Sequence, residues 1–328
     1  MFYRVRKTYR PGIFQGRGRL KNYFEGWYFK LADKRTKNIY SVIPGISIPS
    51  KLGDSYSFIQ IINGRDARSY FFRFDYSDFS YSAKQFEIEI GKNYFSQNRL
   101  KLDIDEGPIR ADLRFCGIKP WPSSIFSPGT MGWYAFVPWM ECYHSVISMD
   151  HEIEGYLNFE KSEIDFSQGR GYIEKDWGVS FPQGWIWLQT NHFDLQGFEG
   201  KPSSIMLSIA RIPWRGRHFK GFLCGLLFDD KFYMFNTYNG SKTISLSYSA
   251  NHVEAVLVNR DFEITIHAER RNTATLLSPV MGAMEGRISE SIDANINVCL
   301  KKKNNGETIF ASTGCCGGLE IVNPAVLA

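Results

Sequence analysis

Residues 109–115 read Ile-Arg-Ala-Asp-Leu-Arg-Phe, a run in which apolar and charged or small side chains alternate. This period of two is typical of a β-strand that buries one face. The same alternation recurs at residues 72–77, 86–90, 100–104, 262–267 and 295–300. Turn signals separate these runs, among them Asn63-Gly64, Gly107-Pro108, Asn239-Gly240 and Asn305-Gly306. The pattern contains no convincing amphipathic helix longer than three turns. We therefore expect an all-β protein whose antiparallel hairpins close into barrels or sandwiches.

The two halves of the chain resemble each other weakly, and 328 residues is a length that suggests about two domains. The stretch Glu-Gly-Trp-Tyr-Phe at 25–29 has a counterpart in Gln-Gly-Trp-Ile-Trp at 183–187, so that Gly26 and Gly184 lie 158 positions apart. An offset near half the chain length predicts two copies of one β unit, although Gly-Trp pairs also recur by chance in a Trp-rich chain. We place the seam in the polar residues 160–168, which predicts one domain over 1–165 and another over 166–328.

The composition excludes several classes of protein. Aromatic residues make up 16% of the chain, which is too many for a disordered segment. The net charge is only +5 and the basic residues are scattered, so nucleic acid is not an expected partner. No stretch approaches 18 consecutive apolar residues, and the polar, Arg-rich N-terminus lacks the apolar region of a signal peptide. Six cysteines without a C-x-x-C pair indicate a reduced, cytoplasmic protein.

The first candidate cluster is Phe-Glu-Gly-Trp-Tyr-Phe-Lys at 24–30. On a strand, Glu25, Trp27 and Phe29 would share one face, whereas Tyr28 and Lys30 would share the other. If Trp27 faces a barrel interior, Glu25 could lie against ring surface and hold a proton for acid catalysis. The simpler interpretation is a core Trp beside a Glu at the rim.

The second cluster is Met-Glu-Cys-Tyr-His-Ser-Val at 140–146, followed by His151. Alternation puts Cys142 and His144 on one face. His144 and His151 could transfer protons, or they could simply be a buried and an exposed histidine. A metal site is not expected, because no third ligand lies at a useful spacing in the sequence.

The third cluster is the densest, and it runs from Gly171 to Pro182 and on into the strand at 185–191. In an extended chain, Tyr172, Glu174 and Asp176 would share one face of the first strand. On the next strand, one face would carry Trp185, Trp187, Gln189 and Asn191. An aromatic wall that carries two carboxylates and two amides has the composition of a small-molecule pocket. A solvated turn could also contain the Glu-Lys-Asp triplet. No nucleotide-binding or nucleophile-elbow motif is present, so no cofactor is expected.

Together these clusters resemble the tocopherol cyclase family in its bacterial branch. The matching stretches are 24–30, 140–151, 171–191 and the Leu-Ser-Pro at 277–279 with Glu290-Ser291, and they span nearly the whole chain. Glu-Lys-Asp-Trp-Gly at 174–178 is also similar to the Asp-His-x-Trp-Gly motif of carotenoid hydratases. Glu174 falls on the Asp of that motif and Lys175 on the His, so the motif histidine is absent here.

The resemblance implies two tandem lipocalin-like antiparallel β-barrels and an isomerase-type reaction. In such cyclases an acid protonates a prenyl double bond and a phenol oxygen attacks the carbocation, which closes a chroman ring. The acid would be Glu174 or Asp176, with the other carboxylate or Lys175 adjusting it, and His144 is a second proton-transfer candidate. The substrate-binding residues would be Tyr172, Trp177, Trp185, Trp187, Gln189, Asn191, Trp27, Tyr28 and Glu25.

Two other functions remain open on the sequence alone. The same aromatic interior would suit a non-catalytic carrier of a quinone or another lipophile, and the rings could also merely fill two cores. A titrating carboxylate in the cavity would favour catalysis over transport. The expected partner is a small lipophilic substrate, and such a substrate is compatible with peripheral membrane contact by a cytoplasmic protein.

Overall fold

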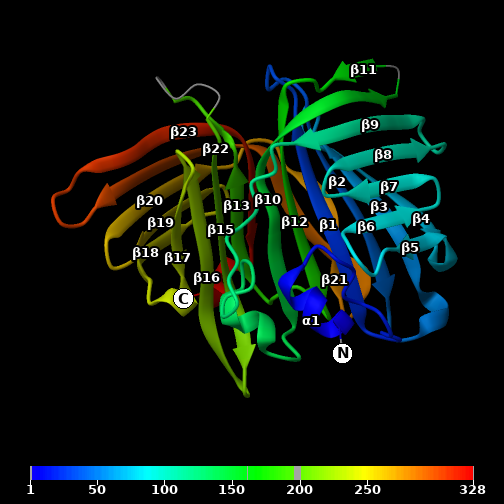
Figure 1. Cartoon of the computed structure of the whole chain (residues 1–328), viewed down its shortest axis with the longest axis horizontal. Coiled ribbons are helices and arrows are strands. Elements are labelled where there is room, and N and C mark those ends of the chain that lie inside the picture. Colours follow the sequence, from blue (N-terminus) through cyan, green and yellow to red (C-terminus); the bar gives the residue numbers. More distant parts are fainter. Residues whose placement is uncertain (1, 161, 196–200, 328) are drawn as a thin grey trace. The chain divides into compact units, whose positions relative to one another are not determined.

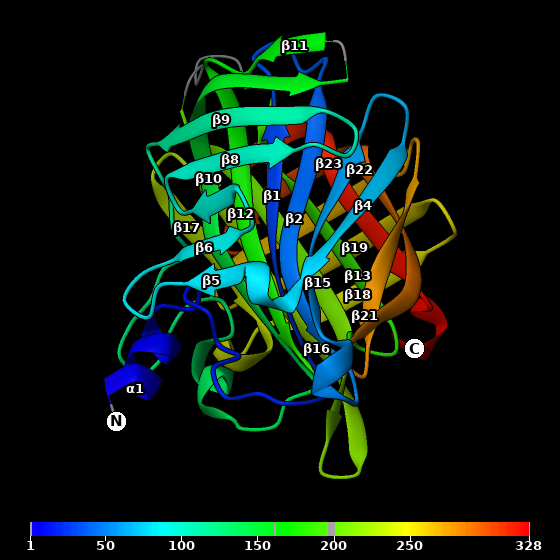
Figure 2. The same ribbon diagram turned by 90° about the vertical axis from the view of Figure 1, so that its right-hand side faces the viewer.

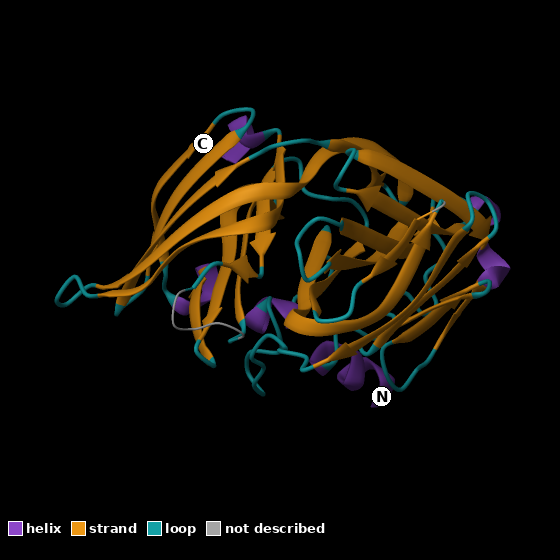
Figure 3. Cartoon of the chain, turned by 90° about the horizontal axis from the view of Figure 1, so that it is seen from above, coloured by secondary structure: helices purple, strands orange, loops and turns teal. Residues whose placement is uncertain are grey.

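The computed structural model describes residues 2–160, 162–195 and 201–327. The chain divides into two compact units: residues 1–181 with 276–287, and residues 182–275 with 288–328. Strands dominate the fold (Figure 3), as the alternating pattern predicts. Among the described residues, no helix has the length and apolar character needed to cross a membrane.

The first unit is built on an antiparallel sheet of 12 strands, counted over the described residues. In chain order the strands are β1 (Tyr23–Ala32), β2 (Ile39–Ile48), β3 (Tyr56–Asn63), β4 (Arg68–Asp75), β5 (Phe79–Tyr81), β6 (Glu87–Ile90), β7 (Asn93–Ser96), β8 (Arg99–Ile104), β9 (Ile109–Cys116), β10 (Cys142–Phe159), β11 (Ser162–Asp165) and β12 (Gly169–Gly178). Their spatial order is β4-β3-β2-β1-β12-β10-β9-β8-β7-β6-β5, and β11 pairs with β10. Strand β12 therefore lies between β1 and β10 (Figure 1).

The second sheet has 11 strands among the described residues. They are β13 (Trp185–Thr190), β14 (His192–Phe193), β15 (Ser203–Trp214), β16 (Arg217–Phe228), β17 (Lys231–Asn236), β18 (Lys242–Tyr248), β19 (His252–Val258), β20 (Phe262–Glu269), β21 (Ala274–Val280), β22 (Ala283–Lys302) and β23 (Thr308–Val322). The order is β17-β16-β15-β13-β23-β22-β20-β19-β18, with β14 paired to β23 and β21 to β22. The all-β prediction is confirmed, with two large antiparallel sheets.

Helical segments are short. They are α1 (Phe2–Tyr9) and the 3-10 turns η1 (Leu52–Asp54), η2 (Tyr76–Asp78), η3 (Gly132–Phe136), η4 (Thr237–Asn239) and η5 (Pro324–Leu327). Figure 2 shows α1 at one end of the first unit, away from β11. The loop between β9 and β10 carries η3.

Each sheet buries one face of its strands in a core of its own. In β9 the buried side chains are Ile109, Ala111, Leu113 and Phe115, the apolar set of the alternating run. The first core also contains Trp27, Phe29 and Ile173, whereas the second contains Ile186 and Leu188. Trp27 thus packs into the first core, whereas Trp185 points away from the second core. The tryptophans of the two Gly-Trp pairs therefore differ in which face of the strand they occupy, the core face for Trp27 and the opposite face for Trp185.

The compact units divide at residues 181 and 182, whereas the sequence places the seam at 165 and 166. The difference has a physical reason. The polar turn at 167–168 is a short interruption between β11 and β12, which both pair antiparallel with successive stretches of β10. Strand β12 pairs along its length with β1 and is an integral part of the first sheet.

Candidate functional site

Strand β12 presents two chemically different faces. Tyr172, Glu174 and Asp176 point to one side, and Lys175 and Trp177 point to the other with Ile173, which belongs to the first core. Tyr172 and Glu174 are buried, and Asp176 is partly exposed. Two proposed catalytic carboxylates therefore lie on the sheet face that is turned away from the core.

His144 comes to these carboxylates from the neighbouring strand. In the β10–β12 pairing it lies directly opposite Asp176. Its Nδ1 atom is 3.0 Å from Oδ1 of Asp176, and its Nε2 atom is 3.7 Å from Oε2 of Glu174. We call His144, Glu174 and Asp176 the acid triad. Its histidine and carboxylates are 30 or more positions apart in sequence, and only the strand register brings them together.

A buried phenol extends the acid triad. The Tyr172 hydroxyl donates a hydrogen bond of 2.6 Å to Oε2 of Glu174. Burial, and then the negative charge of Glu174, raise the pKa of Tyr172 well above its usual range. The phenol therefore keeps its proton and remains a donor to Glu174 at neutral pH.

Strand β1 places further side chains beside the acid triad, on the same face of the sheet. The sequence clusters do not connect these residues with the triad. Tyr28 lies opposite Glu174 in the β1–β12 pairing, and Lys30 lies opposite Tyr172. Residues directly opposite each other in a sheet have neighbouring side chains. Both side chains are buried, Lys30 at 1% exposure. The sequence places Lys30 only on a strand face, because it does not show that β1 pairs with β12.

Cys142 is a further member of this face. Its Sγ atom lies 3.9 Å from Oδ1 of Asp176. Burial, followed by the charges of Asp176 and Glu141, raises the pKa of this thiol well above its usual range. Cys142 is therefore a neutral neighbour of the triad. All six cysteines are free thiols in the structure.

Lys175 and Glu25, both predicted site residues, form a buried ion pair on the core face. Lys175 Nζ is 2.5 Å from Oε1 of Glu25, and both side chains have no solvent exposure. The ammonium also donates to the carbonyl oxygens of Pro11 (2.8 Å) and Ile13 (2.7 Å). Burial lowers the pKa of Lys175 to about 8, against the opposing effect of Glu25.

The remaining partners of Glu25 tie the same N-terminal segment to the sheet. The backbone N–H of Gln15 donates to both carboxylate oxygens of Glu25, at 2.8 and 2.9 Å, and the Tyr23 hydroxyl donates to Oε2. Trp27 donates from Nε1 to the Gly12 carbonyl at 2.9 Å. Glu25 and Trp27 therefore anchor residues 11–15 in this structure.

The rings around Lys175 complete this arrangement. Its ammonium lies 4.6 Å from the ring centroid of Trp27 and 5.0 Å from that of Trp177. Trp177 also stacks on Tyr143 at 5.4 Å. Trp177 thus faces away from Glu174, on the side of β12 that Lys175 occupies.

His151, the second histidine of the 140–151 cluster, is buried in the first core. Its Nδ1 atom lies 3.0 Å from Oγ of Ser148, and its ring is 4.6 Å from that of Phe115. Burial, and then the charge of Arg170, lower its pKa to about 3. His151 is a neutral core residue, and His144 is the histidine that lies beside the carboxylates.

The second unit holds the other predicted substrate-binding residues. Trp185, Trp187 and Gln189 lie on the face of β13 opposite the second core, and all three are buried. Trp185 donates from Nε1 to Oε2 of Glu320 at 2.5 Å. Asn191 follows the strand and is buried as well, with its Oδ1 atom 2.9 Å from Nδ1 of His192.

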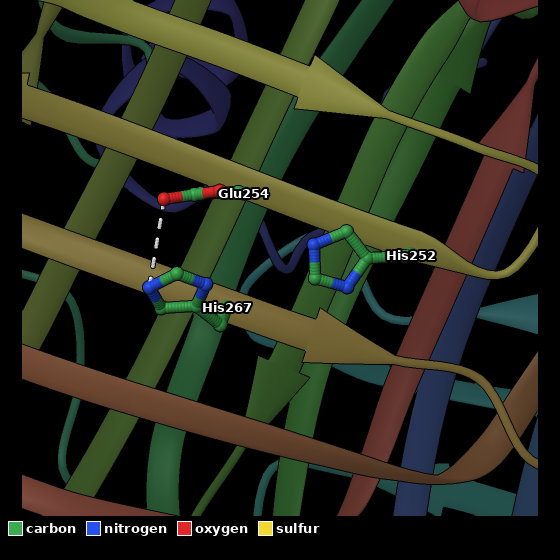
Figure 4. A group of neighbouring side chains, drawn as sticks. All are labelled: His252, Glu254 and His267. Carbon is green, nitrogen blue, oxygen red and sulfur yellow. Dashed lines mark ion pairs between the residues drawn. The ribbon is translucent and has the colours of Figure 1, made fainter.

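Within the described part of the chain, two groups of side chains have donor atoms close enough to share a metal ion. One is the acid triad, and the other is His252, Glu254 and His267, on β19 and β20 (Figure 4). Within each group the donor atoms lie within 4.8 Å of one another. The sequence offers no third ligand near His144, because Glu174 and Asp176 lie on a strand that pairs with the strand of His144.

A separate groove of about 610 Å³, lined by residues of β6–β9, includes none of the triad residues.

A family model described as tocopherol cyclase-like matches residues 109–322, which include the acid triad. The chain belongs to this tocopherol cyclase-like family. The resemblance seen in the sequence is thereby confirmed. Glu25, Tyr28 and Lys30 lie outside the matched residues.

Among curated proteins, the tocopherol cyclase-like chain is 24% identical over 200 residues to the probable chloroplastic tocopherol cyclase of Oryza sativa subsp. japonica. That match covers 58% of this chain and 42% of the rice protein, less than half of the relative's length. Among solved structures, it is similar to CghA, with a TM-score of 0.55, 9% identity and coverage of 92% and 88% of the two chains. Kievitone hydratase from Nectria haematococca gives a TM-score of 0.52, 12% identity and coverage of 91% and 88%. These two likenesses show a shared fold.

Proposed function

We propose that this protein is a cyclase that isomerises a prenylated hydroquinone, or a similar lipophilic phenol, to a chroman by acid catalysis. The observation that carries the proposal is the acid triad with its phenol donor: Tyr172, Glu174, His144 and Asp176 lie in contact on one face of the first sheet. Membership of the tocopherol cyclase-like family supports the same reaction class.

Glu174 is the best candidate for the acid. Its side chain is 6% exposed, whereas that of Asp176 is 24% exposed. A carboxyl group withdrawn from water favours its protonated form. Asp176 touches Nδ1 of His144, and a carboxylate in that position orients the imidazole toward its second neighbour. We therefore assign proton donation to Glu174, proton exchange to His144 and orientation of His144 to Asp176.

Lys175, which the sequence offered as a residue that adjusts the acid, receives no catalytic role in this proposal. Its side chain lies on the other face of β12 and is engaged with Glu25 and two backbone carbonyls. A group that is fully buried on the opposite side of the strand does not reach a substrate bound over Glu174. Its role here is to hold the N-terminal segment.

The proposed reaction is balanced without a cofactor. The Glu174 carboxyl group gives its proton to the less substituted carbon of the prenyl double bond, which forms a C–H bond and a tertiary carbocation. The phenol oxygen of the same substrate attacks this cation and forms the C–O bond of the ring. The phenol proton then passes to His144 and back to Glu174, so that substrate and product are isomers. We assign stabilisation of the cation to the rings of Tyr28 and Tyr172, because both residues neighbour Glu174. Trp185, Trp187, Gln189 and Asn191 remain predicted substrate-binding residues.

The test is turnover of a hydroquinone with one prenyl side chain by the purified full chain. Chroman formation is followed by chromatography and mass spectrometry, and in D2O the product should gain one carbon-bound deuterium. We expect Glu174→Gln to lower kcat by about 10²–10⁴-fold, the usual contribution of a general acid. The matched control is Glu163→Gln, the same change at an exposed position of β11 in the same unit.

Each result has a defined meaning. A wild-type rate in Glu174→Gln would refute the assignment of the acid. Saturable binding of the hydroquinone without any chroman would refute the enzyme and favour the carrier, because a carrier needs the ring surface but not the acid. Equal losses in Glu174→Gln and Glu163→Gln would show that the loss does not depend on this site.

A further inference from the structure

The loop between β9 and β10 exposes an unusual set of large apolar side chains. Trp139 is 89% exposed, Phe126 84% and Ile125 72%. Trp133 and Phe136, on the η3 turn of the same loop, are 45% and 50% exposed. Single exposed apolar residues are common on proteins. Several large ones in one loop indicate a surface that binds another protein, a ligand or a membrane.

Helix α1 borders this loop. The Tyr9 hydroxyl donates to the Ile125 carbonyl at 2.8 Å, and the Tyr9 ring lies 6.1 Å from that of Phe136. We call Tyr9, Ile125, Phe126, Trp133, Phe136 and Trp139 the aromatic rim. All six residues belong to the first unit.

The aromatic rim is held in place by the fold. The Tyr143 hydroxyl donates to the Val137 carbonyl at 2.6 Å, and the backbone N–H of Val137 bonds to Tyr134 at 3.0 Å. The Trp133 ring stacks on Tyr134 at 4.1 Å. The exposed rings are therefore presented by an ordered turn, which lowers the entropy lost when they bind to a surface.

Basic residues predominate in the segments that carry the aromatic rim, although Glu141 lies two positions after Trp139. Between residues 1 and 22 the sequence has seven Lys or Arg and no Asp or Glu, although the chain as a whole has 39 and 34 of them. Between Gly117 and Met140 the only charged residue is Lys119. Arg10 follows α1 directly and is exposed. This is the charge that complements an anionic surface.

We propose that the aromatic rim docks this protein on a bilayer that contains anionic phospholipid. Trp and Tyr side chains are favoured at the level of lipid headgroups, since they combine an apolar ring with a polar group. Apolar insertion and electrostatic attraction act together in such interfacial binding. A protein partner would also bury these rings, but the excess of basic residues in the adjoining segment 1–22 favours an anionic lipid surface. The proposal does not depend on the cyclase reaction, although a bilayer is where a lipophilic substrate would be met.

The test is cosedimentation of the full chain with vesicles of phosphatidylcholine alone and of phosphatidylcholine with 30% phosphatidylglycerol. We expect binding to the mixed vesicles at least tenfold tighter than to the neutral ones, and weaker binding as salt rises. The double variant Phe126→Ser, Trp139→Ser should bind at least tenfold more weakly. Ile125→Ser and Ile244→Ser form a matched pair, because Ile244 is 60% exposed in β18, outside the aromatic rim. Ile125→Ser should weaken binding to the vesicles, and Ile244→Ser should not.

The outcomes decide the proposal. Absence of binding to mixed vesicles, or binding that the rim substitutions leave unchanged, would overturn it. Concentration-dependent self-association that Trp139→Ser abolishes, without vesicle binding, would assign the surface to a second copy of the chain. Melting temperatures equal to wild type would show that the variants are folded. Turnover of the hydroquinone in detergent should stay unchanged in the rim variants, which separates this test from that of the cyclase.

Discussion

Replacement of Lys175 by Met removes one half of the buried ion pair in the first unit. The substitution keeps most of the side-chain volume but leaves the Glu25 carboxylate, which has no solvent exposure, without its countercharge. Gln15 N–H and Tyr23 OH would remain as its donors, and the carbonyls of Pro11 and Ile13 would lose theirs. Breaking a buried pair in this way costs about 3–5 kcal/mol of unfolding free energy.

The expected loss is large enough to measure by thermal unfolding. For a unit of this size, 1 kcal/mol corresponds to roughly 2–4 °C, so Tm of the first unit should fall by about 6–20 °C. The double variant Glu25→Leu, Lys175→Met should recover much of this loss, because no unpaired charge then remains in the core. Lys101→Met, an exposed lysine on β8, is the control and should change stability by less than about 0.5 kcal/mol.

The same variant separates a structural Lys175 from a catalytic one. Measured well below Tm, kcat of Lys175→Met should stay within about threefold of wild type, whereas a residue that adjusts the acid would be expected to cost about 10²-fold or more. The reasoning would be refuted by stability within about 1 kcal/mol of wild type, by a double variant less stable than the single one, or by a folded variant without activity.

Three further predictions concern His151, Gly171 and the acid triad. His151 has a folded-state pKa of about 3, below its ordinary 6.5, so the unfolded state binds the extra proton and stability falls as pH drops below about 6.5. Denaturant titrations at pH 7 and 5 should show about 2 kcal/mol of this loss in wild type and not in His151→Gln. Gly171→Ala should lower stability by about 1–3 kcal/mol in the same assay, because its methyl group would collide with the buried His151 ring. Micromolar Zn²⁺ should inhibit turnover reversibly, since metal binding keeps the triad carboxylates deprotonated. The inhibition should persist in His267→Ala. If His267→Ala abolished the inhibition, the inhibitory zinc site would be the His252, Glu254 and His267 group of Figure 4 instead of the acid triad.

Much of the local structure could be predicted from the order of residues. The alternation at 109–115 and in similar runs predicts strands and the side chains that each strand buries, because successive residues of a strand point to opposite faces. The same rule groups Tyr172, Glu174 and Asp176 on one face and Glu25 and Trp27 on another. Local spacing alone carries this information.

Pairing between distant segments could not be predicted in the same way. The strand register places His144 beside Asp176 and Glu174. It also sets Lys175 opposite Trp27, within reach of the Glu25 carboxylate, which is 150 positions away in sequence. Alternation with a period of two predicts which residues share a face of a strand. It does not predict which strands are neighbours in the sheet. For this reason the sequence predicts a seam at the polar turn near 165 and 166, whereas the strand after that turn belongs to the first sheet.

The sequence by itself determined the all-β class, the faces of its strands and the family resemblance. Only the tertiary structure decided that His144 joins the two carboxylates, that Lys175 is a buried anchor, and that the aromatic rim is exposed. The physical reason is that strand alternation is a local property of the chain, whereas pairing and exposure depend on how the whole sheet buries its apolar surface.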